Sequence, residues 1–219
     1  LKLWEHLHCG ASPPPGLLSS GSPLGAMRAA DASGRQKVLI VGPCEAGKST
    51  IANVLAEAAE TASEAYRPTV GVRILECETE IRSSSQRVTV ELWDVSGDYQ
   101  KFQKCWPAIK KDAAGVILVY NPEKEKHEQE IENWFQWFPR AMNMSPNQVL
   151  VFQSLRRSDV PRRMPLPAKL ATAGVGQPAA VPADDLVSAR KHFSAFLEVV
   201  RQSVLDKQRQ EEEDVMKGG

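Results

Sequence analysis

The chain has 219 residues, enough for one domain with a sizeable hydrophobic core, and its 27 basic and 27 acidic residues cancel to zero formal charge. This balance argues against general nucleic-acid binding and an electrostatic membrane anchor, and no apolar run approaches the ~20 residues that span a bilayer. The four cysteines are scattered without CxxC pairing, which argues against a metal cluster or disulfide framework and favours reduced thiols.

The two ends of the chain differ in composition from its middle. Residues 1–35 are rich in Pro, Gly, Ser and Ala, which predicts a disordered N-terminal extension. Residues 36–208 carry the regular hydrophobic patterns of a folded domain, and residues 209–219 are predicted to form a charged tail. The tail contains no cysteine, so we expect no terminal prenyl anchor.

The folded part begins with a short apolar strand at Lys37–Val41. A glycine-rich turn follows, and then a helix rich in Ala, Leu and Glu is predicted over residues 50–60. Val72–Glu78 and Arg87–Val95 alternate as strands do, and the polar turn Arg82–Gln86 between them predicts a hairpin.

The middle of the chain predicts a helix over Tyr99–Lys111 and then a buried parallel strand over the apolar run Gly115–Asn121. Pro122 suits the first turn of the next helix, which has an apolar face at helical spacing. That face consists of His127, Ile131, Trp134, Phe135 and Phe138. Trp137 lies off this face, and we interpret it as the candidate for an exposed partner contact.

Gln148–Gln153 predicts another core strand, and the basic, proline-rich residues 154–168 predict an irregular loop. The stretch KLATAGV is a candidate for the last strand, and Asp184 is placed to cap a final helix. The apolar stripe of that helix is Leu186, Ala189, Phe193, Phe196, Leu197, Val200 and Val204. We expect the helix to fray from Glu211. Strands alternating with helices indicate an α/β fold, with a mostly parallel sheet between helix layers and the hairpin at one edge.

The glycine-rich turn GPCEAGKS, residues 42–49, satisfies G-x-x-x-x-G-K-[ST] between a strand and a helix, the context that this phosphate loop requires. Its glycines permit the turns that point backbone amides at a phosphate, and the helix N-terminus adds positive potential. Lys48 would reach the β- and γ-phosphates, and the Ser49 hydroxyl would ligate Mg²⁺. The loop residues predicted to bind nucleotide are Gly42, Glu45, Ala46, Gly47, Lys48, Ser49 and Thr50. The motif alone leaves ATPases, kinases and GTPases open.

Two later segments, TVGV at residues 69–72 and WDVSG at residues 93–97, resemble the two switches of Rab-type small GTPases. The resemblance implies that Thr69 closes over Mg²⁺ and the γ-phosphate, that Asp94 holds Mg²⁺ and that the Gly97 amide binds the γ-phosphate. The implied metal set is therefore Ser49, Thr69 and Asp94, and the implied cofactors are GTP or GDP with Mg²⁺. The implied fold is the P-loop small-GTPase fold, with a mostly parallel six-stranded sheet between helices.

A narrower group of motifs, which includes VGPCEAGKS, RPTVGVRILECE, WDVSGD and CWPAIKKDAAGVILVYN, is similar to the Rab-like GTP-binding subunits of intraflagellar transport. The similarity covers residues 36–138 well and is weak over residues 154–182. It implies a component of complex B that docks on the coiled-coil subunits of that complex. The implied locations are the cilium or flagellum, the basal body and the cytoplasm.

Three departures from this family indicate weak hydrolysis and weak base recognition. Asp98 replaces the glutamine that orients the attacking water, and a carboxylate cannot donate the hydrogen bond that an amide gives. Cys44 replaces a phosphate-loop glycine, and its side chain would crowd an incoming arginine finger. The base-reading Asn-Lys-x-Asp motif is missing, because the chain reads FQSLRRSD there. Arg156 stands in place of the Asn, and Asp159 could read the base only if the loop bulges.

Three functions remain open on these residues. The leading hypothesis is a nucleotide-dependent interaction module, in which GTP and Mg²⁺ order Thr69 and residues 94–102 for a partner. The second is a true GTPase whose missing catalytic group comes from a partner. The third is a structural pseudo-GTPase that docks whatever its nucleotide.

Overall fold

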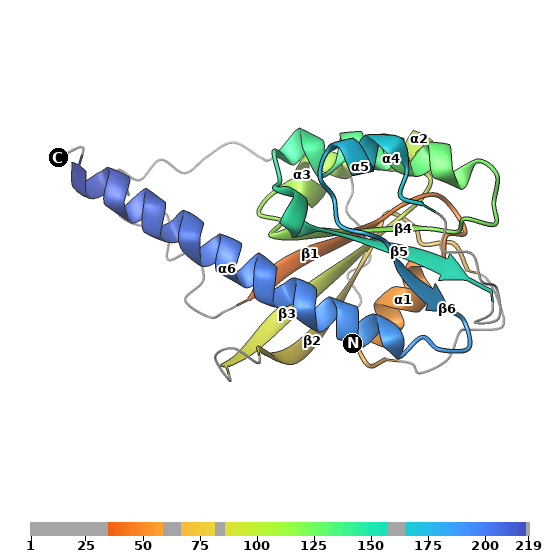
Figure 1. Ribbon diagram of the computed structural model, residues 1–219, viewed down its shortest axis with the longest axis horizontal. Helices are drawn as coiled ribbons and strands as arrows, with labels where there is room; N and C mark the ends of the chain where they lie inside the picture. Colours follow the sequence, from red (N-terminus) through yellow and green to blue (C-terminus); the bar gives the residue numbers. More distant parts are fainter. Residues whose placement is uncertain (1–34, 59–66, 82–85, 157–164, 218–219) are drawn as a thin grey trace, which may run out of the picture.

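Six strands form one sheet in the order β2-β3-β1-β4-β5-β6 (Figure 1). The strands are β1 (Gln36–Val41), β2 (Val72–Ile81), β3 (Gln86–Val95), β4 (Gly115–Tyr120), β5 (Val149–Leu155) and β6 (Ala179–Pro182). Only the β2–β3 pair is antiparallel, and the other four pairs are parallel. The α/β fold class, with a mostly parallel six-stranded sheet and the hairpin at one edge, is therefore confirmed. This computed structural model describes residues 35–58, 67–81, 86–156 and 165–217.

Helices cover both faces of the sheet, as Figure 1 shows. One face packs against α1 (Lys48–Leu55) and α6 (Ser188–Lys217). The other packs against α3 (Trp106–Lys110), α4 (His127–Trp137) and α5 (Ala168–Thr172), with α2 (Tyr99–Phe102) beside them. Three 3₁₀ turns complete the described elements: η1 (Gln103–Cys105), η2 (Arg140–Met142) and η3 (Pro146–Gln148).

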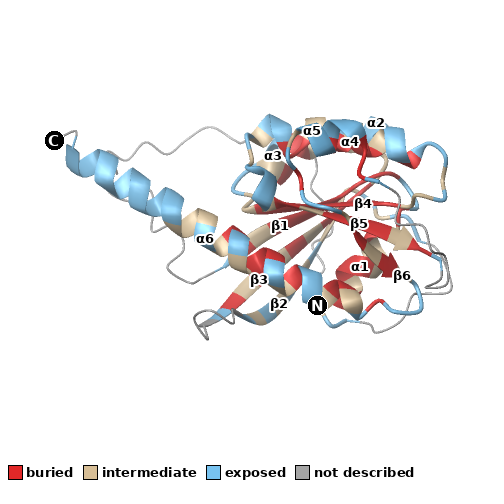
Figure 2. Cartoon of the chain, viewed as in Figure 1, coloured by how far each residue is buried: buried red, intermediate tan, exposed pale blue. Residues whose placement is uncertain are grey.

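The central strands are apolar because both of their faces are covered. Every residue of β4 is buried (Figure 2). From Val116 to Tyr120, alternate side chains enter the two cores on either side of the sheet. A parallel sheet of this kind collects loops at the carboxyl ends of its strands, where ligands bind in α/β folds. The phosphate loop follows β1 at that edge, so this packing positions the candidate site.

The helix predicted over Tyr99–Lys111 is divided into α2, η1 and α3. Pro107 lacks a backbone N–H and lies in the first turn of α3, where a new helix can begin but an existing one cannot easily continue. The next helix begins at His127 and not at Pro122. The Asn121 side chain accepts a hydrogen bond from the Glu123 amide at 2.8 Å, which closes a turn in place of a first helical turn.

The candidate last strand KLATAGV is wrong, because most of this stretch belongs to α5. The sixth strand is β6, which lies after this stretch, where no strand was predicted. β6 has four residues and ends in Pro182, so its local pattern is too short to mark a strand. It forms through parallel pairing with β5, in which Phe152 is opposite Ala179.

The final helix begins at Ser188, whose amide donates to the Asp185 side chain at 3.3 Å. The acidic run from Glu211 remains helical to Lys217, contrary to the expected fraying. Pairs four residues apart support it, including Gln210 with Asp214 at 3.1 Å.

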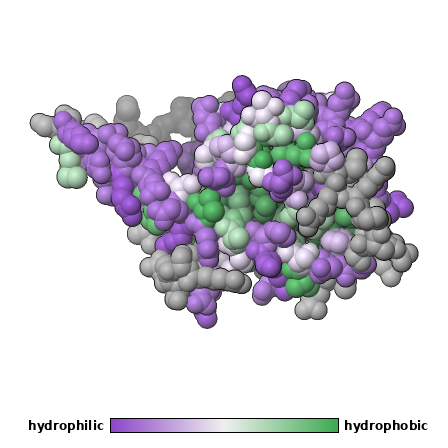
Figure 3. All heavy atoms as spheres, in the orientation of Figure 1, coloured by the Kyte–Doolittle hydropathy of each residue, from purple (hydrophilic) through white to green (hydrophobic). Residues whose placement is uncertain are grey.

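Only the first part of α6 packs on the sheet. Its last buried residue is Val200, and beyond it the helix projects from the body and carries mainly hydrophilic side chains (Figures 1 and 3). Across the described ranges, no helix is both long and apolar enough to cross a membrane. Residues 1–34 of the predicted extension over residues 1–35 lie outside the described residues, and so do residues 82–85 at the centre of the predicted hairpin turn.

Candidate functional site

The phosphate loop places Lys48 at its centre. The Lys48 side chain is buried, and its Nζ donates to the Gly42 carbonyl at 3.0 Å and to the Pro43 carbonyl at 2.6 Å. Burial lowers the pKa of Lys48 to about 8, although the nearby Asp94 carboxylate raises it. Lys48 therefore keeps most of its charge at neutral pH and can meet an anion at the N-terminus of α1.

Two side chains hold the outer side of the loop to the start of α4. Glu45, exposed and with a positive φ of 57°, forms an ion pair with Lys124, and that bond lowers the pKa of Glu45. His127 is buried, accepts from the Asn121 amide at Nδ1 (3.2 Å) and hydrogen-bonds the backbone of Cys44. The sequence predicted His127 only as a residue of the apolar helix face. Its loop contact depends on tertiary packing.

Ser49, Thr69 and Asp94 come together as a cluster, here called the metal-site cluster. The Ser49 and Thr69 hydroxyl oxygens are 2.9 Å apart, and Thr69 donates to Asp94 Oδ2 at 3.3 Å. The three residues come from α1, from the segment before β2 and from the end of β3, so distant parts of the sequence meet here.

The metal-site cluster has the chemistry of a site for a hard cation. Asp94 is fully buried, and its Oδ1 has no hydrogen-bond partner among the described residues. A buried carboxylate oxygen without a donor is costly unless it faces a cation or a bound water. Two hydroxyls beside one carboxylate suit Mg²⁺, which takes oxygen ligands and keeps several of its own waters.

Gly97 lies directly against the phosphate loop. A Cβ built on Gly97 would lie 2.5 Å from the Cys44 backbone nitrogen, too close for any larger residue without movement of the loop. The predicted phosphate-sensing amide is therefore beside the predicted phosphate-binding loop.

Asp98 is already engaged within its own helix. Its Oδ1 accepts from the Lys101 amide at 3.3 Å, and its Oδ2 pairs with Lys101 Nζ at 2.9 Å. These Lys101 contacts lower the pKa of Asp98, so the carboxyl stays ionised. An ionised, helix-capping carboxylate is a poor group for orienting an attacking water near a γ-phosphate.

A cavity of about 280 Å³ lies between the phosphate loop, α2 and α4. Its lining includes Cys44, Gly97, Asp98 and Trp137. Trp137 is half-buried, with ring centroids 5.1 Å from Tyr99 and 5.3 Å from Trp106. Trp137 is therefore less exposed than the sequence predicted, because Trp106 packs against it, while its role as a partner contact stays a prediction.

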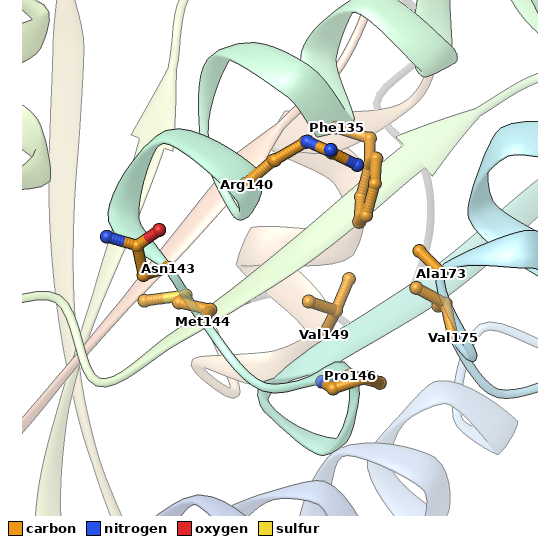
Figure 4. A pocket seen from close by; sticks show the side chains of 8 residues that line it. All are labelled: Phe135, Arg140, Asn143, Met144, Pro146, Val149, Ala173 and Val175. Atoms are coloured by element: carbon orange, nitrogen blue, oxygen red, sulfur yellow. The ribbon is translucent and has the colours of Figure 1, made fainter.

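A second cavity of about 460 Å³ is lined by Phe135, Arg140, Asn143, Met144, Pro146, Val149, Ala173 and Val175 (Figure 4). Val149 begins β5, so this cavity lies at the amino end of the strand, away from the phosphate loop. It is not part of the candidate site.

The end of β5 approaches the phosphate loop through Ser154. A Cβ on Gly47 would lie 2.5 Å from Ser154 Oγ, so this side chain and not Arg156 faces the loop. Arg156 instead reaches Glu123, with 3.8 Å between Nε and Oε2, in an exposed pair. Asp159, the fallback base reader, lies outside the described residues. Ser154 was not among the predicted site residues, since only the alternation of side chains along β5 shows which one faces the loop.

Comparison with known proteins agrees with this geometry. The family described as "Ras of Complex, Roc, domain of DAPkinase" matches residues 37–155. The chain is also similar to the intraflagellar transport protein 22 homolog of Danio rerio, at 42% identity over 118 residues. This match covers 52% of the chain and 63% of the relative, so the chain spans less than two thirds of the curated relatives that it first matches. The resemblance to Rab-like intraflagellar transport subunits is confirmed.

Two crystal structures are similar over most of the chain. The GTP-bound structure of T. brucei IFT22/74/81 has a TM-score of 0.58 and 29% identity, covering 79% of this chain and 98% of that one. The GDP-bound structure of T. brucei IFT22 has a TM-score of 0.55 and 28% identity, covering 77% and 97%. Both likenesses agree with the α/β architecture described above.

Proposed function

Because the chain belongs to the family of Ras of Complex (Roc) domains, we propose that it is a GTP-binding subunit of intraflagellar transport complex B. It acts as a nucleotide-dependent interaction module and hydrolyses GTP slowly. One observation carries the proposal: Lys48 and the metal-site cluster are assembled at the N-terminus of α1, and both lie beside the two switch segments.

The residues have defined roles in this function. The loop amides and Lys48 would bind the phosphates. The Ser49 and Thr69 hydroxyls would hold Mg²⁺ directly, and the Asp94 carboxylate would hold it through a bound water. When bound, Mg²⁺ neutralises charge on the β- and γ-phosphates. Thr69 and Gly97 then lie where they can distinguish GTP from GDP, since each belongs to one switch segment.

Hydrolysis is expected to be slow for two reasons. The Asp98 carboxylate is paired with Lys101, and it adds negative charge near the γ-phosphate where a neutral amide would help. Cys44 is exposed at the rim of the phosphate loop, where its side chain stands in the way of an arginine supplied by another protein. The module therefore senses the γ-phosphate better than it removes it.

The proposed partners are the coiled-coil subunits of complex B, and the proposed location is the cilium or flagellum, the basal body and the cytoplasm. The relative of known structure that contains IFT22 with 74 and 81 supports this choice of partner. The Danio rerio relative, an intraflagellar transport protein 22 homolog, supports the location in cilia.

The experiment measures binding of fluorescent GTP, GDP and ATP to the chain, and binding of a coiled-coil IFT74/81 complex in the presence of each nucleotide. We expect GTP and GDP to bind and GTP to strengthen the partner complex. Lys48→Ala should weaken nucleotide binding by at least about tenfold, because it removes a charged contact to the phosphates. It should weaken the partner complex as well.

Lys169→Ala is the matched control, because Lys169 is an exposed lysine that pairs with Glu132 and does not line the cavity beside the phosphate loop. Partner binding that survives Lys48→Ala undiminished would identify a pseudo-GTPase instead. Rapid hydrolysis that appears only when the partner is added would identify a GTPase completed in trans.

A further inference from the structure

The Arg73 guanidinium brings a positive charge to the metal-site cluster. Its guanidinium donates to Asp94 Oδ2 at 3.1 Å and to the Ser49 carbonyl at 3.3 Å. Neither the phosphate-loop motif nor the switch motifs assign a role to this residue. Arg73 is the second residue of β2, so its backbone is fixed by pairing with Asp94 across the hairpin.

The position of Arg73 follows from the register of β2 and β3. Arg73 is directly opposite Asp94 in the antiparallel ladder, and cross-strand neighbours of opposite charge attract each other. The Arg73 side chain is 41% exposed, whereas that of Asp94 is fully buried. The guanidinium therefore reaches from solvent to a carboxylate that has no other charged partner at hydrogen-bond distance among the described residues.

The charge balance of the cluster makes this contact important. A buried carboxylate is costly unless a cation compensates it, and a hydrogen bond between ionised groups is stronger than a neutral one. Mg²⁺ would draw on the same Asp94 charge. The Arg73 charge at Asp94 Oδ2 therefore lowers the affinity of the cluster for Mg²⁺. If Arg73 stays, it repels the metal ion, and if it moves aside, its own ion pair with Asp94 is lost.

We propose that Arg73 is a resident counter-ion of Asp94 that shares this carboxylate with Mg²⁺, and that it makes nucleotide binding less dependent on the metal. The inference rests on the proposed function for the identity of the metal and the nucleotide. Arg73 is a positioning residue here: it compensates Asp94 while the metal is absent and weakens the hold of the cluster on the metal.

The test compares wild-type chain with Arg73→Met, which keeps an unbranched stem but removes the charge. Affinity for fluorescent GDP is measured in Mg²⁺ and in EDTA, and the two dissociation constants give a ratio for each variant. We expect the ratio of the EDTA value to the Mg²⁺ value to rise about tenfold in Arg73→Met, the scale of one hydrogen bond to a charged group. Arg73→Lys should restore part of the wild-type ratio.

Arg87→Met is the control, because Arg87 lies on the same hairpin and is 81% exposed, with only a 4.0 Å pair to Glu78. A ratio in Arg73→Met equal to those of wild type and Arg87→Met would overturn the inference.

A second measurement separates this inference from the proposed function. The unfolding temperature of each variant is followed as MgCl₂ is added without nucleotide. In EDTA, the unfolding temperature of Arg73→Met should be lower than that of Arg87→Met. As MgCl₂ is added, the unfolding temperature of Arg73→Met should rise at lower Mg²⁺ concentrations than that of wild type. If no variant binds GDP, the proposed function fails, and this titration alone decides the role of Arg73. Identical Mg²⁺ responses in all variants would then reject it.

Discussion

His127 links the phosphate loop to α4 at the scale of a single residue. Burial, followed by the positive charges of Lys124 and Lys48, lowers the pKa of His127 to about 4. The ring is therefore neutral at physiological pH, and Nδ1 can accept the hydrogen bond from the Asn121 amide. A neutral imidazole beside two lysines adds no further positive charge to the back of the loop.

This depressed pKa predicts a loss of stability in acid. The unfolded chain binds the His127 proton near pH 6.5, whereas the folded chain binds it only near pH 4. Protons therefore favour the unfolded state as the pH falls from 6.5 to 4, by up to about 1.4 kcal/mol per pH unit. His127→Gln should flatten this part of the curve of unfolding free energy against pH, measured by urea denaturation.

His192→Gln supplies the control, because His192 is exposed on α6. Its pH profile should follow that of wild type. Profiles of wild type and His127→Gln that remain parallel from pH 6.5 to pH 4 would contradict a buried neutral histidine.

At the scale of elements, an aromatic cluster joins α3 to α4. Trp106 lies 5.7 Å from Trp134, 5.3 Å from Trp137 and 4.9 Å from Phe138, measured between ring centroids. These distances are typical of favourable aromatic pairs. Because α2, η1 and α3 are each too short to be stable alone, Trp106 supplies much of the packing that holds the second switch segment against α4.

Truncation of this side chain should therefore be costly. Trp106→Ala is expected to lower the free energy of unfolding by about 3–5 kcal/mol, as for other buried aromatic residues. Trp106→Phe should cost much less, since it keeps an aromatic ring and removes an indole N–H that has no partner in the described part of the chain. Guanidinium denaturation monitored by circular dichroism measures both, and equal losses would show that the ring contacts contribute little.

At the scale of the whole molecule, only the first half of α6 packs against the hydrophobic core. Its buried residues are Ala189, Phe193, Phe196, Leu197 and Val200. Gly115 of β4 lies beneath them, since a Cβ there would be 2.8 Å from the Phe196 ring. The remainder of the helix contributes no buried side chain, and its exposed end includes Val215 and Met216.

Two truncations should separate the halves of α6. Removal of residues 207–219 should change the free energy of unfolding by no more than about 0.5 kcal/mol, because the described residues among them, 207–217, are all exposed. Removal of residues 196–219 also deletes the buried Phe196, Leu197 and Val200. Loss of each side chain lowers the free energy of unfolding by about 2–5 kcal/mol, so this truncation should unfold the domain. Thermal unfolding measures both, and a large loss in the shorter truncation would mean that the projecting end packs on the body.

Local patterns along the chain were sufficient for most of the fold. The strand β4 and the buried face of α4 are long, regular patterns, and each appears in the structure where its pattern predicts. The break at Pro107 was missed because one long helix and two short helices share the same local pattern. The strand β6 was missed because it forms by pairing with β5.

The sequence by itself was enough to predict the phosphate loop and the two switch segments, because each is defined by residue types at fixed short spacings, and the alternation of two neighbouring strands predicted the hairpin. Only the tertiary structure decided which distant side chains meet there. It placed Arg73 on Asp94, Ser154 against Gly47 and His127 behind Cys44. Each of these contacts joins residues from different strands, loops or helices, so sheet register and helix packing set it, and no spacing along the chain records it.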